Sequence, residues 1–188
     1  MSKVYLYADP HFGHENMAKK RGFKTVEEHD EFIVKKWNET VNKNDKIYLL
    51  GDITMEKSNY EILKRLKGNK VVVLGNHDKP GHIPELLKYV SAVAGAIKYK
   101  GYLLTHVPIH KKEIKRFRAN IHGHVHENII NNSKYVCVSA EAVNYIPLEI
   151  STININFNLK KYVYNIYSKL ITFAVSFRMG RRKINLQS

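Results

Sequence analysis

The sequence predicts an α/β fold in which helices cover a central sheet. Short apolar runs rich in Val, Ile and Tyr alternate along the chain with segments whose apolar residues recur at helical spacing. These runs are nearly continuous, as in parallel strands that are buried on both faces. With 188 residues, 44% of them hydrophobic and 26% charged, the chain is long enough for one domain with a sizeable core.

Six runs predict strands, because each is short, apolar and bounded by polar or glycine residues. In chain order they are KVYLYA (3–8), KIYLLG (46–51), KVVVLG (70–75), YLLTH (102–106), ANIHG (119–123) and YVCVS (135–139).

Three segments predict helices. Thr25–Glu28 is a capping-box pattern, and Ile33, Trp37 and Val41 follow at a spacing of four. Ser58–Glu61 repeats the pattern before a second apolar stripe, and Gly68 lies where that helix would stop. Pro84 can open a third helix that continues to Val90.

The net charge of +14 and a pI near 9.7 favour contact with polyanions, although a merely solvated surface is an equal alternative. The single cysteine excludes an intramolecular disulfide and a four-thiolate metal site, which suits a reducing, cytoplasmic location. Because a strand is predicted from Lys3, we expect no signal peptide. No apolar run approaches the roughly 20 residues of a membrane span.

The last 38 residues differ in composition from the rest. Ser151–Ser188 holds seven Lys and Arg and no acidic residue, which is half of the net charge. We therefore expect one domain over 1–150 and a basic extension over 151–188 that is helical or partly disordered. Tyr162, Ile166 and Leu170 form a stripe that would pack on the core or lie on an anionic surface. Core packing is the more common use of such a stripe, so peripheral membrane contact is not expected.

Polar clusters follow five of the predicted strands, at the end where open α/β sheets bind their ligands. The segments are DPHFGHEN (9–16), LGD (50–52), LGNHD (74–78), LLTH (103–106) and HGHVH (122–126). One such histidine would be unremarkable, but apolar strands do not need five endings made of Asp, Asn and His.

The donor atoms in these clusters are carboxylate and amide oxygens and imidazole nitrogens. This mixture suits Mn²⁺, Fe, Zn²⁺, Ni²⁺ or Co²⁺ and is too rich in nitrogen for a dedicated Ca²⁺ or Mg²⁺ site. Seven candidate ligands fit two ions that share a bridging carboxylate. In HGHVH, both His124 and His126 can reach the site only if the chain turns, which Gly123 permits.

The series D-x-H, G-D, G-N-H-D, H and G-H-x-H resembles the calcineurin-like metallophosphoesterases, and its motifs stand in the family's order from Asp9 to His126. The resemblance implies a four-layer αββα sandwich of two mixed β-sheets flanked by helices. It implies that one metal ion is bound by Asp9, His11 and His126, that the other is bound by Asn76, His106 and His124, and that Asp52 bridges them.

The resemblance also implies a mechanism. Two ions about 3.5–4 Å apart would hold a bridging hydroxide for in-line attack on phosphorus. His77 would be the general acid, and Asp78 would orient its ring. His14 and Asn16 fit no ligand position, so we expect them at the mouth of the site, where they either contact substrate phosphate or stabilise the loop.

We therefore expect a hydrolase of phosphate esters that uses two divalent ions, with Mn²⁺ the first choice. A phosphodiesterase acting on a nucleotide or nucleic-acid-type substrate is favoured, and a nuclease acting on DNA or RNA is the first alternative. A scaffold with this fold that binds a partner but has lost catalysis is a third interpretation. It is disfavoured because His77 and all seven candidate ligands are present.

Overall fold

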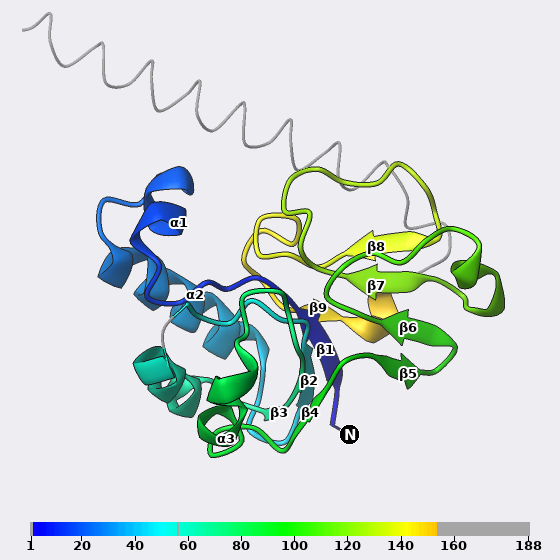
Figure 1. Cartoon of the computed structure of the whole chain (residues 1–188). Helices are drawn as coiled ribbons and strands as arrows, with labels where there is room; N and C mark the ends of the chain where they lie inside the picture. The colour runs from blue at the N-terminus through cyan, green and yellow to red at the C-terminus, as the bar shows by residue number, and fades with distance from the viewer. Residues whose placement is uncertain (1, 56, 154–188) are drawn as a thin grey trace, which may run out of the picture. The chain divides into compact units, whose positions relative to one another are not determined.

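The structure is a computed structural model that describes residues 2–55 and 57–153. It contains two β-sheets, with strand orders β4-β3-β2-β1-β9 and β5-β6-β7-β8 (Figure 1). The first sheet consists of β1 (Val4–Tyr7), β2 (Lys46–Leu49), β3 (Asn69–Val73), β4 (Ala92–Ala94) and β9 (Leu148–Glu149). The second consists of β5 (Ile97–Tyr99), β6 (Tyr102–Leu104), β7 (Asn120–His122) and β8 (Tyr135–Cys137).

Both sheets are mixed. Strands β1 to β4 pair in parallel, and β9 pairs antiparallel with β1. In the second sheet β5 is antiparallel to β6, whereas β6, β7 and β8 are parallel. The expected architecture of two mixed sheets with flanking helices is therefore confirmed.

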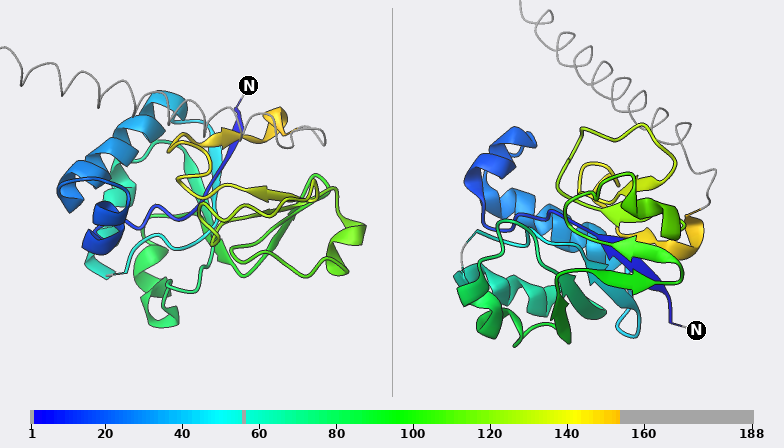
Figure 2. Two further views of the ribbon diagram at one scale, coloured as in Figure 1. Left: turned by 90° about the horizontal axis from the view of Figure 1, so that it is seen from above. Right: turned by 45° about the vertical axis from the view of Figure 1, so that its right-hand side comes forward.

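The helices are α1 (Glu15–Lys20), α2 (Val26–Thr40) and α3 (Ile83–Leu86), with 3₁₀ helices η1 (Lys57–Arg65), η2 (Pro80–His82), η3 (Glu113–Arg116) and η4 (Ile150–Thr152). Helices α1, α2 and α3 lie on one side of the first sheet, and the second sheet lies on the other (Figure 2). The segment with η3 lies beside the second sheet.

Alternation along β1 divides the core in two. Tyr5 and Tyr7 pack toward the helices, where Trp37 is fully buried. Leu6 faces the second sheet and belongs to a separate buried cluster that includes Ile121. Because both faces of β1 are covered, the strand reads as a continuous apolar run in the sequence.

Helix α2 begins as predicted. The Thr25 side chain accepts a hydrogen bond from the Glu28 backbone N–H, at 3.1 Å, which satisfies one of the free donors of the first turn. Ile33 and Trp37 are fully buried on the sheet-facing side. The Trp37 indole N–H donates to the Lys67 carbonyl, so this large side chain is buried without an unpaired donor.

Two predicted helices differ from expectation. The segment that begins near Ser58 is the 3₁₀ helix η1, which starts at Lys57, so Ser58 lies inside it and is not its cap. Around Pro84, the turns η2 and α3 together span Pro80 to Leu86, and the α-helix stops well before Val90. The chain near Pro84 thus has two short turns of helix in place of one longer helix.

All six predicted strands are present with ends within two residues of expectation, but β4, β5 and β9 were not predicted. None of the three contains a buried residue, whereas the equally short β6, β7 and β8 do, so they do not stand out as apolar runs. The predicted basic tail lies outside the described residues beyond Ile153. Within the described part of the chain, no helix combines the length and the apolar character needed to cross a membrane.

Candidate metal centre

The seven candidate ligands follow the carboxyl ends of strands in both sheets. Asp9 and His11 follow β1, Asp52 follows β2 and Asn76 follows β3. His106 follows β6, and His124 and His126 follow β7. Because the strands that precede them run in parallel within each sheet, these side chains reach one region where the two sheets meet.

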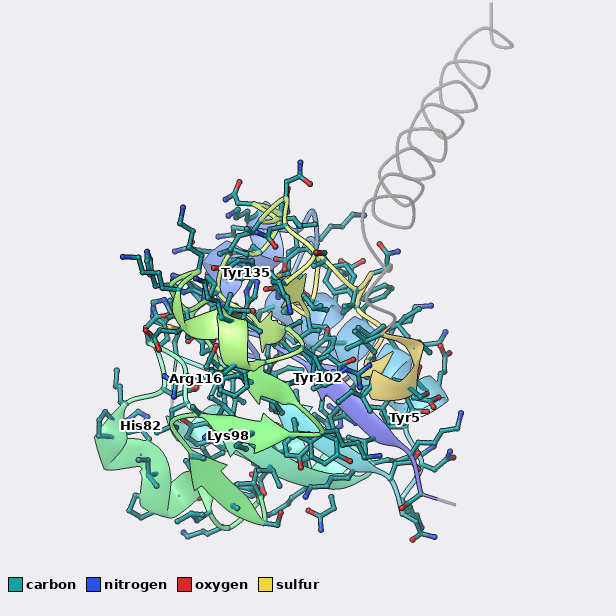
Figure 3. The ribbon with its side chains drawn as sticks, turned by 90° about the vertical axis from the view of Figure 1, so that its right-hand side faces the viewer. Tyr5, His82, Lys98, Tyr102, Arg116 and Tyr135 are labelled. Atoms are coloured by element: carbon teal, nitrogen blue, oxygen red, sulfur yellow. The ribbon has the colours of Figure 1, made fainter. Side chains whose placement is uncertain are left out.

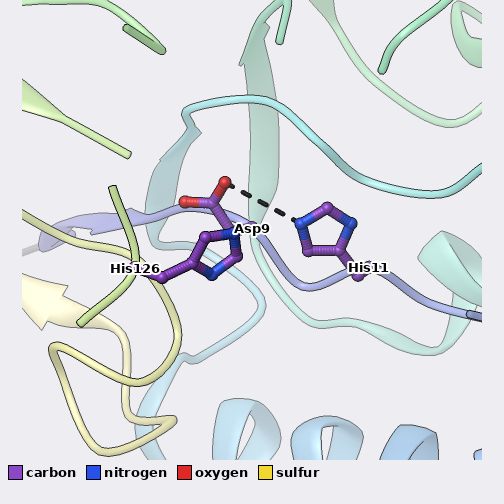
Figure 4. A group of neighbouring side chains, drawn as sticks. All are labelled: Asp9, His11 and His126. Carbon is purple, nitrogen blue, oxygen red and sulfur yellow. Dashed lines mark ion pairs between the residues drawn. The ribbon is translucent and has the colours of Figure 1, made fainter. Parts of the chain in front are cut away.

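Asp9, His11 and His126 form one group, with one donor atom of each within 4.8 Å of the others (Figure 4). Nε2 of His11 is 4.0 Å from Oδ1 of Asp9. The rings of His11 and His126 are stacked, with centroids 5.4 Å apart. These are the residues that the resemblance assigns to the first ion.

Asp52, His106 and His124 form a second group of the same kind. Oδ1 of Asn76 lies 2.9 Å from Nε2 of His106 and 2.9 Å from Nδ1 of His124. Ligand atoms about 2.1 Å from one ion and at right angles are about 3 Å apart. The spacing around Asn76 therefore matches that of donors around a single cation.

The Asp52 carboxylate lies between the two groups. Its Oδ2 is 3.9 Å from Nε2 of His11 in the first group and 3.4 Å from Nε2 of His106 in the second. Its Oδ1 accepts the backbone N–H of His77 at 3.0 Å. The Asp52 carboxylate thus lies within 4 Å of a nitrogen from each group.

Unpartnered buried atoms show that these residues fit a cation. Among the described residues, only five buried side-chain atoms lack a hydrogen-bond partner, and three of them are Oδ1 of Asp9 and both ring nitrogens of His11. A buried polar atom without a partner costs roughly 1–3 kcal/mol. Metal coordination would satisfy Oδ1 of Asp9 and one nitrogen of His11.

The contacts of the His106 ring also fit a bound cation. Its Nδ1 is 2.8 Å from the Leu50 carbonyl oxygen, which can only accept, so Nδ1 carries a proton. Its Nε2 faces the acceptor oxygens of Asp52 and Asn76. In neutral His106 this nitrogen is also an acceptor, so its contact with Oδ2 of Asp52 is favourable only with a cation or an added proton between the two atoms. A divalent ion meets this requirement and can also bind Oδ1 of Asn76.

Burial acts oppositely on the two members of the first group. It raises the pKa of Asp9 to about 6 and lowers the pKa of His11 to about 3. His11 is therefore a neutral imidazole, which is the form that binds metals. A cation bound beside Asp9 would lower this raised pKa and favour the ionised form.

Five of the seven candidate ligands have left-handed backbone conformations. The φ angles are 56° at Asp9, 51° at His11, 53° at Asp52, 69° at His124 and 50° at His126. Such φ values are uncommon outside glycine and cost roughly 1–3 kcal/mol each. Backbone strain is concentrated at these five residues. This indicates that the positions of their side chains are maintained at the expense of a relaxed backbone conformation.

Two glycines beside the site let carboxylate groups approach the backbone closely. A Cβ atom added to Gly123 would lie 2.5 Å from Oδ2 of Asp9, and one added to Gly75 would lie 2.2 Å from Oδ1 of Asp52. We expected Gly123 to supply the turn in HGHVH, but the left-handed residues are His124 and His126 themselves. Gly123 instead leaves space for the Asp9 carboxylate, which accepts the His124 backbone N–H at 2.9 Å.

Comparison with known proteins identifies relatives over most of the chain. The chain is 34% identical over 168 residues to the uncharacterized protein MJ1445 of Methanocaldococcus jannaschii, covering 81% of this chain and 90% of that protein. The chain belongs to the family of this archaeal protein. It is also 30% identical over 166 residues to the gene 66 protein of Mycobacterium phage D29, covering 71% of this chain and 83% of the phage protein.

A solved structure has the same fold. The protein of unknown function AQ665 from Aquifex aeolicus superposes with a TM-score of 0.62 at 25% identity, covering 81% of this chain and 98% of that chain. No family model matches the sequence. These similarities establish the fold and the family of the chain.

Two residues that sequence reasoning missed support the first group. Glu141 lies 3.1 Å from Nδ1 of His126, and the Arg21 guanidinium donates to Glu141 at 2.8 Å. Arg21 also donates to the carbonyls of Asp9 and Pro10, at 2.7 and 2.9 Å. Glu141 follows β8 just as Asp9 follows β1, so the strand-end signal was available. Nothing in the sequence marks Arg21, which is placed by the fold alone.

The charge of Glu141 is maintained by these contacts. Burial alone would raise its pKa, but hydrogen bonds from His126 and the Arg21 charge lower it to about 2. An ionised Glu141 holds the proton of His126 on Nδ1 and leaves Nε2 free as a ligand atom. His126 is thereby fixed in the tautomer that a metal site needs.

His77 and Asp78 follow β3, beside Asn76. Nε2 of His77 is 3.9 Å from Oδ2 of Asp52, and its side chain is 44% exposed, so it can reach a bound molecule. We expected Asp78 to orient the His77 ring. Its carboxylate instead accepts the backbone N–H groups of Asp52, Ile53 and Gly75, at 2.8, 3.1 and 2.8 Å. Asp78 therefore positions the loop that carries Asp52.

The structure places His14 beside the site but gives Asn16 no contact with it among the described interactions. The His14 and His11 rings have centroids 5.9 Å apart, and partial burial lowers the pKa of His14. His14 also precedes α1 as its N-cap residue. Asn16 is exposed in the first turn of that helix. Of the two residues expected at the mouth, His14 is the nearer.

Proposed function

We propose that this protein hydrolyses phosphodiester bonds with two divalent metal ions. The observation that carries the proposal is the position of the Asp52 carboxylate between two groups of donor atoms. Three imidazole nitrogens, from His11, His106 and His77, lie 3.4 to 3.9 Å from its Oδ2. A carboxylate placed between nitrogen donors of two groups is what a two-metal phosphoryl-transfer site needs.

The donor set supports transition metals. Asp9, His11, His126 and Asp52 would hold one ion, and Asn76, His106, His124 and Asp52 would hold the other. Mixed oxygen and nitrogen donors without thiolate fit Mn²⁺, Fe, Zn²⁺, Ni²⁺ or Co²⁺, and we take Mn²⁺ as the first choice. When bound, such a pair lowers the pKa of water and neutralises charge on the phosphoryl oxygens.

The remaining steps fall to side chains of this chain. His77 is the general acid: it holds a proton on its exposed ring and gives it to the leaving oxygen. Asp78 keeps the Asp52 loop in place through three backbone hydrogen bonds. Glu141 and Arg21 keep His126 and the Asp9–Pro10 backbone in the conformation that presents the ligands.

The proposal is tested by hydrolysis of bis(p-nitrophenyl) phosphate with Mn²⁺ and with EDTA. We expect turnover that requires the metal and that Asp52→Asn abolishes. Asp45→Asn is the matched control, because Asp45 is also a buried carboxylate but is bound by Lys3 and Asn42, which lie outside the site. Metal-dependent turnover by the wild-type protein that Asp52→Asn leaves unaffected would exclude the two-metal scheme.

A further inference from the structure

The positive charge of residues 1–150 is concentrated in the second sheet. Between Gly95 and Ala140 there are eight Lys and Arg and two Glu, a net charge of +6, out of +7 for residues 1–150. The eight side chains are all exposed. They are Lys98, Lys100, Lys111, Lys112, Lys115, Arg116, Arg118 and Lys134, and we call them the basic face.

Topology places most of the basic face along the outside of this sheet. Strands β6 and β7 are parallel, so the connection 105–119 must return along the length of the sheet to begin β7. It crosses the outer side, where the Ile109 N–H donates to the Asn120 side chain and the Tyr135 hydroxyl donates to the Ile109 carbonyl. The connection begins directly after the candidate ligand His106.

The strand register brings Lys98 to the same side. Lys98 pairs with Leu103, Leu103 with Asn120, and Asn120 with Tyr135, so these four residues form one row across the outer face. Figure 3 shows Lys98 and Arg116 on this side of the molecule. Lys98 and Arg116 therefore lie on the same side of the second sheet, and the connection that carries Arg116 begins at the end of β6 next to His106.

Ion pairs are rarer among these cations than around the first sheet. There, several surface cations pair with carboxylates, as in Lys64–Glu61 and Arg65–Glu31 at 2.8 and 2.7 Å. On the basic face, the described interactions include one such pair, Arg116–Glu113 at 3.3 Å. A surface that served only for solubility would mix both signs of charge.

Aromatic rings accompany the cations instead. Nζ of Lys98 lies 5.9 Å from the centroid of Phe117, whereas the ring 4.9 Å from the Arg118 guanidinium, that of Tyr102, is buried and can take no base. Phe117 and Tyr135 are partly exposed. Cations beside exposed rings are the combination that binds a nucleic acid strand, because phosphates contact the former and bases stack on the latter.

We propose that the basic face binds the phosphate backbone of a nucleic acid strand and leads it to the metal centre. As an assignment of substrate this rests on the proposed function, because a strand on this face would be the polymer that the site cuts. As a binding surface it can be tested without catalysis. We favour nucleic acid over an anionic lipid surface for two reasons. The rings of Phe117 and Tyr135 are partly exposed, and the connection that carries most of the cations begins directly after His106.

The test uses fluorescence anisotropy of labelled 20-nucleotide DNA and RNA strands with the full chain in EDTA. The variant Lys111→Gln/Lys112→Gln/Lys115→Gln is compared with Lys24→Gln/Lys35→Gln/Lys43→Gln, which removes the same charge from exposed positions near α2. We expect at least about a tenfold loss of affinity in the first and less than about twofold in the second, at 100 mM salt. The slope of log K against log salt should fall by about 2 to 3 in the first.

Equal losses in the two variants, or no binding of either strand at 50 mM salt, would overturn the proposal. So would binding of phosphatidylserine vesicles that competes with the strands and depends more strongly on the three lysines. The proposed function is tested separately, by measuring hydrolysis of bis(p-nitrophenyl) phosphate by the wild-type protein. Circular dichroism melting of both variants checks that they are folded.

Discussion

Nδ1 of His126 and the carboxylate of Glu141 are 3.1 Å apart, and the Arg21 guanidinium holds Glu141 from its other side at 2.8 Å. A carboxylate behind a ligating histidine fixes the tautomer of the ring and raises its basicity. Through Arg21, the same contact reaches the backbone of Asp9. A residue outside the ligand set thus positions two of the three ligands of the first group.

Glu141→Gln should therefore lower the metal affinity of the first site and leave that of the second unchanged. We expect a loss of about 10- to 100-fold in Mn²⁺ affinity at one of two sites, measured by isothermal titration calorimetry. Glu149→Gln is the control, because Glu149 pairs only at the surface with Lys3 and Ser151. If both sites keep their affinity in Glu141→Gln, the positioning role is wrong.

His77→Ala should keep metal binding and lose turnover. General acid catalysis contributes roughly 10²- to 10⁴-fold, and more for a poor leaving group. We expect a large fall in kcat on a dinucleotide and a smaller one on bis(p-nitrophenyl) phosphate, because p-nitrophenolate leaves without a proton. His82→Ala, in η2, is the matched control. The same loss on both substrates would argue against proton donation by His77.

Stability should depend on pH through Asp45. Backbone N–H groups of Lys3 and Asn42 bind its carboxylate, each at 2.8 Å, and lower its pKa below the usual value. A depressed pKa in the folded state contributes stability that is present above about pH 4 and is lost as pH falls through the folded pKa.

Asp45→Asn should accordingly lower the free energy of unfolding by about 1–3 kcal/mol at pH 7, measured by urea denaturation. The difference from wild type should shrink progressively below pH 4. A difference that is unchanged at pH 2.5 would show that the effect of Asp45 does not depend on its charge.

The Cys137 thiol should react slowly in the folded protein. Burial raises its pKa to about 11, and its sulfur lies 3.2 Å from the Ser139 hydroxyl oxygen. The thiolate is the reactive form, so little of it is present at pH 8. We expect alkylation by iodoacetamide to be at least about 100-fold slower in the native protein than in urea. Rapid labelling of the folded chain would contradict this environment for Cys137.

The sequence predicted the first sheet well because its parallel strands are buried on both sides and read as apolar runs. Val71, Val72 and Val73 show why: alternate residues face the two different cores. Strands such as β9, with Leu148 and Glu149, have no period to detect. The existence of a second sheet was predicted only by the resemblance to a family. Its strands are short apolar runs like those of the first sheet, so the sequence pattern does not show which sheet a strand belongs to.

The candidate ligands were predictable for a chemical reason, and their supports were not. Asp and His directly after an apolar strand have no packing role, so Asp9 and His106 stand out in the sequence. Arg21 in a polar helix end looks like any surface residue, although its side chain is 1% exposed in the fold. Asp78 was identified as important, but its partners are backbone groups that only the structure brings together.

The most direct test of the two-ion centre is electron paramagnetic resonance of the protein loaded with Mn²⁺, with the metal content measured in parallel. We predict two Mn²⁺ ions per chain with an exchange-coupled spectrum, and loss of that coupling in Asp52→Asn. One ion per chain, or two uncoupled ions in the wild-type protein, would contradict the bridging position of Asp52.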